Sequence, residues 1–413
     1  MTGHRLRHAA FALAALASAS GAHAATCRLD AANAAAAGPG CARQWMDRNL
    51  RVNDLLAVGT HNSYKHAIPE ADYRIIAAHD AMLAKRIDYA HKSLTAQLDA
   101  GAREIEIDVV YDPQGGRYAS PLIARLTHAR LDPAWVAAMR RPGFKVLHIP
   151  DADFRSSCIT FERCLGEVKA WSRAHPDHVP ITILINAKQG EAAPGGVPLL
   201  PFDAKAFDAL DREVRAVLPP SMLITPDDVQ GHYPTLRDAV LHDNWPRLGE
   251  ARGRIMFALD ESPPVVAVYR GKRRSLEGRA MFVNAPDEAS PVAAYFTLNE
   301  PEKEAGRIAR DVRTGFLVRT RADADTMQAR SNDTAHRDLA LRTGAQMVST
   351  DYIWADPRFP GDYTVRLPGH AAAVCNPVRA RAKCGGVAVE TVTDADWRAA
   401  EAAPLISPPS RGQ

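Results

Sequence analysis

The chain has 413 residues, of which 46% are hydrophobic and 24% are charged. This composition is ordinary for a globular protein and excludes disordered, collagen-like and coiled-coil architectures. The formal net charge of +3 is too small to supply the basic excess that drives sequence-independent binding to nucleic acid. We therefore expect a folded protein without a nucleic-acid partner.

The first 24 residues have the organisation of a secretory signal peptide. Arg5 and Arg7 precede an apolar run over residues 9–17, and the small-residue sequence AHA ends the segment at Ala24. The apolar run is too short to span a bilayer. This pattern predicts an exported protein, periplasmic or secreted, that has no transmembrane segment.

Six cysteines follow this segment and fall into three pairs of neighbours along the sequence. Export favours disulfide formation, and short separations close loops at little entropic cost. We therefore expect disulfides at 27–41, 158–164 and 375–384, with free buried thiols as the alternative. None of the pairs has the Cys-x-x-Cys spacing of a zinc site, so a zinc cluster is not expected.

Short β-rich apolar runs alternate with helical segments along the chain. The expected strands cover residues 55–58, 104–110, 144–147, 181–185, 254–259, 280–283, 316–319 and 346–349, and helical spacing with caps marks 203–217, 238–241 and 332–342. Parallel strands need crossover helices, so this alternation predicts an α/β fold, a (β/α)8 TIM barrel. An open doubly wound sheet is the alternative, but no glycine-rich phosphate-binding motif follows any of the runs.

These patterns divide the chain into a signal peptide (1–24), an N-terminal segment (25–50), a catalytic barrel domain (51–356) and a C-terminal tail (357–413). The tail is rich in proline, glycine and alanine, and we expect it to pack on the barrel without extending the sheet. The first and last cysteine pairs would staple the N-terminal segment and the tail.

Polar side chains gather where the expected strands end, which is where reactive groups stand in such barrels. The candidates are His61 and Asn62 after the first strand, Glu106 and Asp108 in the second, His148 after the third, and Asn186 and Lys188 at the end of the fourth.

Glu106 and Asp108 project from the same face of their strand, because side chains alternate along a strand. Two unpaired carboxylates this close would raise each other's pKa and cost stability, so a cation between them is the simplest resolution. Oxygen ligands without cysteine favour a hard ion, Ca²⁺ or Mg²⁺, with Asn62 and Asn186 as neutral donors. Salt bridges to arginine are the structural alternative, and they would argue against the ion.

His61 and His148, at separate strand ends beside such an ion, suit the cleavage of a phosphodiester. One imidazole would accept a proton from the attacking hydroxyl group, and the other would donate a proton to the leaving oxygen. Histidine titrates near neutrality, so both protonation states are accessible. A purely structural role for each histidine is the alternative.

Further polar residues are candidates for contact with a substrate. Arg319 and Arg321 share one strand face, where they either hold a phosphate or sugar hydroxyls or pair with Asp323 and Asp325.

Lys188 stands at the end of the fourth strand, and Asp351 and Tyr352 stand at the end of the eighth, where they either face a substrate or satisfy loop backbone. Asp260 and Glu261, after the fifth strand, are additional candidate metal ligands.

Taken together, these residues resemble the Ca²⁺-dependent phosphatidylinositol-specific phospholipases C, particularly the exported bacterial branch. The resemblance covers residues 55–356. It rests on the motifs GTHNSY (59–64), REIEIDV (103–109), FKVLH (144–148), LITPDD (223–228), LVRTRADAD (317–325) and VSTDY (348–352).

The resemblance implies a PLC-like phosphodiesterase barrel in which His61 and His148 are the catalytic pair and Ca²⁺ is the cofactor. It implies that the inositol 2-hydroxyl attacks the adjacent phosphorus, which releases diacylglycerol and forms a cyclic inositol phosphate. The partner would then be a phosphatidylinositol-like phospholipid at a membrane surface, and we expect the enzyme to act on it as a monomer.

The resemblance also implies that Asn62, Glu106 and Asp108 hold the calcium ion. Eukaryotic relatives complete the calcium shell with a glutamate on the fourth strand, where this chain has Asn186. The change removes one negative charge, for which Asp260, Glu261 or water would compensate.

Two other functions compete with this one. Glycerophosphodiester phosphodiesterases and sphingomyelinase D-like enzymes use a similar barrel, but they typically have His-Arg after the first strand where this chain has His61 and Asn62. A catalytically silent barrel that binds phospholipid head groups or a partner protein is the third possibility, and only the change at Asn186 supports it.

Overall fold

The computed structural model describes residues 39–192 and 194–405. Its central element is a curled sheet of eight parallel strands. These are β1 (Leu55–Thr60), β2 (Glu104–Val110), β4 (Ile181–Lys188), β6 (Ile255–Leu259), β7 (Phe282–Val283), β8 (Tyr295–Thr297), β9 (Leu317–Arg321) and β10 (Met347–Thr350).

Hydrogen bonding between neighbouring strands closes this sheet into a ring. The order β6-β4-β2-β1-β10-β9-β8 is hydrogen-bonded throughout, and β7 pairs with β6. A parallel bridge between Asn284 and Tyr295 links the end of β7 to β8 and closes the ring. The predicted (β/α)8 barrel is therefore confirmed.

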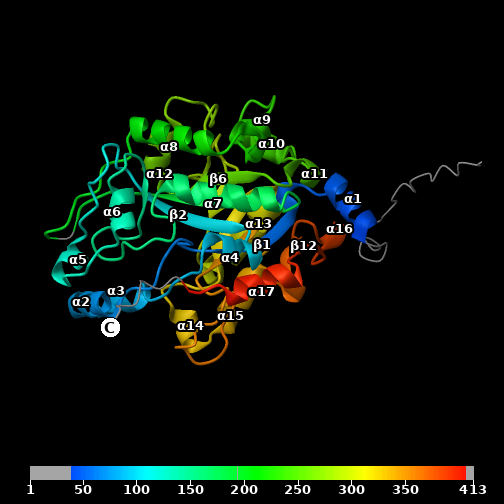
Figure 1. Cartoon of the computed structure of the whole chain (residues 1–413). Coiled ribbons are helices and arrows are strands. Elements are labelled where there is room, and N and C mark those ends of the chain that lie inside the picture. Colours follow the sequence, from blue (N-terminus) through cyan, green and yellow to red (C-terminus); the bar gives the residue numbers. More distant parts are fainter. Residues whose placement is uncertain (1–38, 193, 406–413) are drawn as a thin grey trace, which may run out of the picture.

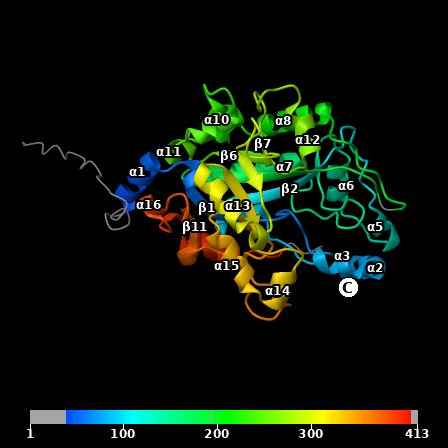
Figure 2. The same cartoon turned by 180° about the vertical axis from the view of Figure 1, so that it is seen from behind.

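Helices surround the sheet, and their bounds are α1 (Pro39–Asn49), α2 (Glu70–His79), α3 (Ala81–Arg86), α4 (Leu94–Asp99), α5 (Leu122–Leu126), α6 (Pro133–Met139), α7 (Phe161–Ala174), α8 (Ala204–Val217), α9 (Pro226–Gln230), α10 (Leu236–Leu241), α11 (Leu248–Ala251), α12 (Pro263–Arg270), α13 (Pro301–Thr314), α14 (Met327–Ser331), α15 (Thr334–Arg342), α16 (Arg381–Cys384) and α17 (Asp394–Ala402). The predicted helices correspond to α8, α10 and α15. Figures 1 and 2 show α2, α3, α5 and α6 at one end of the barrel, and α1, α11 and α16 at the other.

The helix α8 illustrates how the sequence sets these elements. Asp203 caps its first turn by accepting a hydrogen bond from the backbone N–H of Ala206, which would otherwise lack a helical partner. Phe207, Leu210 and Val214 recur at helical spacing and are all buried. Local capping and the apolar stripe therefore agree on both the start and the orientation of the helix.

The predicted third barrel strand was wrong. Residues 144–147 contain only the two-residue strand β3 (Lys145–Val146), which pairs antiparallel with the end of β2 and lies outside the parallel ring. The eighth strand of the ring is instead β8, which lies between β7 and β9. The sequence did not reveal it because only three residues, Tyr295–Thr297, adopt strand geometry. A further short strand, β5 (Leu223–Ile224), extends the edge of β6.

The expectation that the tail adds no strand was also wrong. β11 (Ala371–Cys375) runs antiparallel to the first half of β1, and β12 (Ala388–Thr391) pairs with β11. β2 pairs with β1 only at Gly59 and Thr60, so the earlier residues of β1 present an open edge that β11 covers.

Two of the predicted disulfides, Cys158–Cys164 and Cys375–Cys384, are present. Cys27 and the predicted signal peptide lie outside the described residues. Within residues 39–192 and 194–405, no helix is both long enough and apolar enough to cross a membrane.

Gly59 fixes the close approach of β1 to β2. A side-chain carbon added at this position would lie 2.5 Å from the Cβ atom and the backbone oxygen of Glu104, closer than atoms can pack. Because Gly59 pairs with Glu104 in the ladder, this contact sets the register that brings the segment after β1 beside the carboxylates of β2.

Candidate active site

The predicted site residues gather at the carboxyl end of the barrel, on a run of neighbouring strands. β4, β2, β1, β10 and β9 are adjacent in that order, and every site residue predicted from the sequence lies on or directly after them except His148 and the two residues after β6, Asp260 and Glu261. The register pairs Asp108 with Asn186 directly. His148 reaches the same end from the loop after β3, whose partner is β2.

His61 is held by a buried aspartate. Its Nδ1 atom lies 2.9 Å from Oδ1 of Asp351, and the other Asp351 oxygen lies 3.1 Å from the guanidinium of Arg321. The hydroxyl of Tyr89 is a further neighbour of Nδ1, at 3.2 Å. These contacts orient the ring so that Nε2 lies 3.7 Å from Glu106 and 3.4 Å from Arg321.

The surroundings of His61 favour its neutral form. Burial lowers its pKa well below the usual 6.5, and the positive charge of Arg321 lowers it further, while Glu106 acts in the opposite direction. A positive charge on His148 acts in the same direction as that of Arg321.

His148 has the same arrangement with different partners. Its Nδ1 atom lies 2.8 Å from Oδ2 of Asp153, and the ammonium group of Lys65 lies 3.2 Å from the same oxygen. Lys65 and Asp153 are both buried. Burial alone would raise the pKa of Asp153, but Lys65 and His148 outweigh it and hold that pKa below its ordinary value.

Protein cations lie against Glu106 and Asp108, two of the three carboxylates of β2. Glu106 accepts hydrogen bonds at 2.7 Å from Arg319 and at 2.8 Å from the amide of Asn186. Lys188 approaches Oδ2 of Asp108 to 3.0 Å. Glu106 is therefore paired with an arginine, which was the alternative to a bound cation, while Asp108 faces a partly exposed lysine.

The oxygen atoms around Asp108 nevertheless match a hard cation. Among the described residues, Oδ1 of Asn62 and Oδ1 of Asp108 are buried without a hydrogen-bond partner, while Oδ2 of Asp108 faces the ammonium group of Lys188 at 3.0 Å. Asn62 adopts a left-handed backbone conformation with φ of 46°. Its amide nitrogen donates a hydrogen bond of 2.8 Å to the hydroxyl of Tyr89, and this bond fixes the orientation of the side-chain amide. Orphaned oxygens of this kind are the ligands that Ca²⁺ takes.

The four residues predicted to contact a substrate divide into two pairs. The side chains of Lys188 and Arg321 are partly exposed, at 33% and 13%. Arg319 is buried and donates to Asn299, Glu106 and Ser349, each at 2.7 Å.

Tyr352 is also buried, with its ring packed against Phe359 and Tyr363. A substrate at the barrel mouth can therefore reach Lys188 and Arg321 but not Arg319 or Tyr352.

Asp260 and Glu261 have local roles at the end of β6. Asp260 accepts a hydrogen bond of 3.3 Å from the amide of Asn284. Glu261 accepts one of 2.7 Å from the backbone N–H of Ala187, and burial raises its pKa to about 7. The aspartates after β9 do not pair with Arg319. Arg321 donates to the backbone oxygen of Asp323 at 2.8 Å.

Three residues of this site were missed by sequence reasoning: Lys65, Tyr89 and Asp153. Lys65 directly follows the motif that contains His61, and Asp153 lies five positions after His148, so proximity in sequence was the only available signal. No sequence signal pointed to Tyr89, because the loop in which it lies has no periodic pattern.

Comparison with known proteins gives a family match. The model of a family described as "Phosphoinositide phospholipase C, Ca2+-dependent" matches residues 50–377. No curated protein matches the chain significantly.

Among solved structures, the chain is similar to the calcium-dependent phosphoinositol-specific phospholipase C of a Pseudomonas species (17% identity, 73% of this chain and 91% of that chain, TM-score 0.47). It is also similar to the Ca²⁺-dependent phosphatidylinositol-specific phospholipase C of Streptomyces antibioticus (18% identity, 73% and 94%, TM-score 0.46). A glycerophosphoryl diester phosphodiesterase from Parabacteroides distasonis is more distant (12% identity, 72% and 84%, TM-score 0.31).

Proposed function

Because the chain belongs to the Ca²⁺-dependent phosphoinositide phospholipase C family, we propose that His61 and His148 cleave phosphatidylinositol by shared acid–base catalysis. The observation that carries this proposal is the pair of imidazoles at one barrel mouth, each anchored through Nδ1 to a buried aspartate. Anchoring through Nδ1 fixes the tautomer and leaves Nε2 free for proton transfer.

The proposed reaction is an intramolecular displacement at phosphorus. The inositol 2-hydroxyl forms a bond to phosphorus, the bond from phosphorus to the glycerol oxygen breaks, and diacylglycerol leaves. One imidazole takes the proton from the attacking hydroxyl, and the other supplies a proton to the departing oxygen. Lys188 and Arg321, the accessible cations of the mouth, bind the phosphate oxygens.

Asn62, Asp108, Asn186 and Glu106 are the residues that would hold Ca²⁺. A bound calcium ion would lower the pKa of the attacking hydroxyl and offset the charge that develops on the phosphate. The Oδ1 atoms of Asn62 and Asp108 support this assignment most directly, because both are buried without a hydrogen-bond partner. Arg319, which is buried against Glu106, positions that carboxylate and does not touch the substrate.

The signal-like N-terminal sequence and the disulfides support export to the periplasm or the medium, where calcium is available and thiols oxidise. There the enzyme acts as a monomer on phospholipid at a membrane surface.

A head-group panel tests the function. Phosphatidylinositol, its phosphorylated forms, sphingomyelin and glycerophosphodiesters are each supplied with calcium present or chelated, and the release of water-soluble phosphate is measured. We expect calcium-dependent release from phosphatidylinositol. Preference for glycerophosphodiesters would favour the competing phosphodiesterase function, and binding without turnover would favour a silent barrel.

Substitution of the imidazoles tests the mechanism. His61→Ala and His148→Ala should each lower kcat by about 10²–10⁴-fold, the usual contribution of acid–base catalysis, while leaving the unfolding temperature within a few degrees. His232→Ala, at an exposed histidine outside the barrel mouth, is the matched control and should keep full activity. Activity that survives the His61 and His148 substitutions would reject this site.

A further inference from the structure

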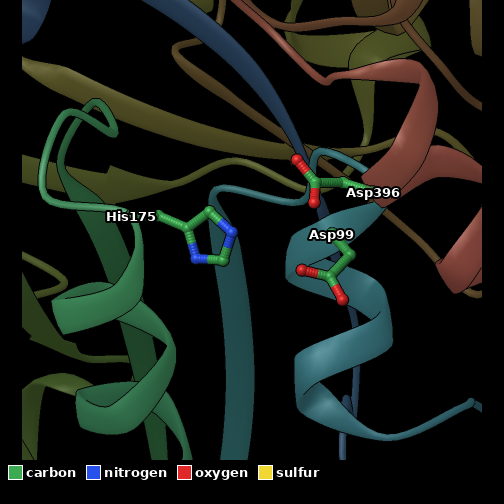
Figure 3. Close-up of side chains that lie close together, drawn as sticks. All are labelled: Asp99, His175 and Asp396. Atoms are coloured by element: carbon green, nitrogen blue, oxygen red, sulfur yellow. The ribbon is translucent and has the colours of Figure 1, made fainter.

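Three metal-ligating side chains converge at the opposite, amino end of the barrel. Asp99 ends α4, His175 follows α7, and Asp396 lies in the first turn of α17. Each offers one ligand atom, and these atoms all lie within 4.8 Å of one another. Figure 3 shows the imidazole and the two carboxylates arriving from three separate ribbons and facing a common space.

The imidazole of His175 is oriented for coordination. Its Nδ1 atom donates a hydrogen bond of 2.9 Å to the backbone oxygen of Trp171, and the two rings stack with centroids 4.2 Å apart at 17°. A proton on Nδ1 leaves a lone pair on Nε2. Figure 3 shows that the ring nitrogen farther from the chain, which is Nε2, faces the two carboxylates. Metal-binding histidines are typically fixed in this way by a carbonyl group on their other nitrogen.

Both carboxylates are also fixed by groups outside the cluster. The indole N–H of Trp171 donates to Oδ1 of Asp99 at 2.6 Å, and the hydroxyl of Thr393 donates to Oδ2 of Asp396 at 2.7 Å. Each aspartate thus keeps one oxygen for another partner.

Among the described residues, no lysine or arginine forms an ion pair with this cluster. Among the described ion pairs, none within 4.0 Å joins His175 to Asp99 or Asp396. The charge of Arg103 acts on Asp99, but Arg103 makes its salt bridge with Glu390. Two carboxylates and an imidazole lone pair therefore face one another without a salt-bridge partner among the described residues.

We propose that Asp99, His175 and Asp396 bind a divalent transition-metal ion of the Zn²⁺ class. The nitrogen donor selects against Ca²⁺, which takes oxygen ligands, and imidazole combined with carboxylates suits zinc. All three residues line a groove with a volume of about 560 Å³, which gives the ion a path from solvent and room for water ligands. The ion would tie α17, in the C-terminal tail, to α4 and α7 of the barrel.

Zinc titration of the metal-free protein tests this proposal. We expect calorimetry to show one zinc site that remains in His61→Ala, and fluorescence to fall on binding because Trp171 stacks on a ligand. His175→Gln and Asp396→Asn should each weaken binding by at least about tenfold and remove the fluorescence change. Asp394→Asn, at an exposed position of the same helical turn, is the matched control and should bind zinc normally.

Several results would overturn the site. Zinc binding that is unchanged in both His175→Gln and Asp396→Asn, or that disappears in His61→Ala, would place the ion elsewhere. A cluster that binds Ca²⁺ but not Zn²⁺ would overturn the proposed class of ion, and a cluster that binds neither would mean that the three residues form only a polar contact between helices. Circular dichroism of Asp396→Asn, which alters an accessible side chain, separates loss of binding from loss of folding.

Discussion

The two ends of the barrel handle clustered acidic groups in opposite ways. At the carboxyl end, Arg319 meets Glu106, Lys188 meets Asp108, and Lys65 meets Asp153. At the amino end, Asp99 and Asp396 face an imidazole with no ion pair of their own among the described contacts.

The difference separates catalysis from folding. The carboxyl end carries its own compensating cations, so its structure does not depend on an ion even though its proposed chemistry does. The amino end leaves charge uncompensated, so an ion bound there contributes mainly to stability. The following predictions test this contrast, in order of expected effect.

The largest expected change is the loss of Arg319. Arg319→Met removes the cation that pairs with Glu106 and leaves this buried carboxylate without its salt-bridge partner, which costs about 3–5 kcal/mol in the free energy of unfolding. Denaturant unfolding measures this. Arg74→Met, whose side chain is 72% exposed and pairs weakly on the surface, should change the same free energy by less than about 1 kcal/mol. Equal effects of the two substitutions would contradict the view that buried carboxylates at the carboxyl end depend on protein cations.

Lys65→Met should affect both stability and turnover. It leaves Asp153 without its buried cation, so we expect a loss of about 3 kcal/mol together with a fall in kcat, because His148 loses a fixed partner. Lys205→Met, at an exposed lysine of α8, is the control.

The pH dependence has a defined sign here. The lowered pKa of Asp153 contributes stability that is present above the unfolded pKa, about 3.9, and is lost as the pH falls through the lower folded value. Lys65→Met should therefore lose less stability than the parent protein on acidification below pH 4. If the free energy of unfolding of Lys65→Met fell with pH below 4 as steeply as that of the parent protein, Lys65 would not hold Asp153 in its ionised form.

Loading each ion alone should give opposite results at the two ends. With Ca²⁺ only, we expect turnover and a small change in unfolding temperature. With Zn²⁺ only, we expect no turnover but an unfolding temperature higher by a few degrees, and this increase should vanish in Asp396→Asn. Activity assays and thermal unfolding on the same preparations make the comparison, and a single ion that controlled both properties would remove the distinction.

The smallest expected effect concerns Glu213, an acidic residue of α8 outside both ends. Burial raises its pKa to about 7. The unfolded chain ionises near pH 4.3 while the folded chain does not, so stability falls as the pH rises from about 4.5 to about 7. Glu213→Gln removes this loss and should gain about 1–2 kcal/mol at pH 8 but almost nothing at pH 4. Unfolding curves at the two pH values measure it, and a gain of equal size at both would exclude an ionisation effect.

The sequence predicted the carboxyl end better than the amino end, for a physical reason. Glu106 and Asp108 alternate with buried isoleucines, so their common face follows from strand geometry alone. β8 was missed because three residues of strand carry no alternation that can be recognised. Asp99, His175 and Asp396 come together only through the packing of three helices, and no local pattern connects positions so far apart.

The pairing of β11 with β1 has a consequence for how this chain is made. β1 leaves the ribosome before any other strand of the ring, yet its first half acquires its edge partner only when residues 371–375 emerge. The strand that carries His61 must therefore wait for nearly the whole nascent polypeptide, and loop closure over that distance makes its docking a late event. Truncation of the last 45 or so residues should accordingly leave a product that never matures, rather than a shorter enzyme.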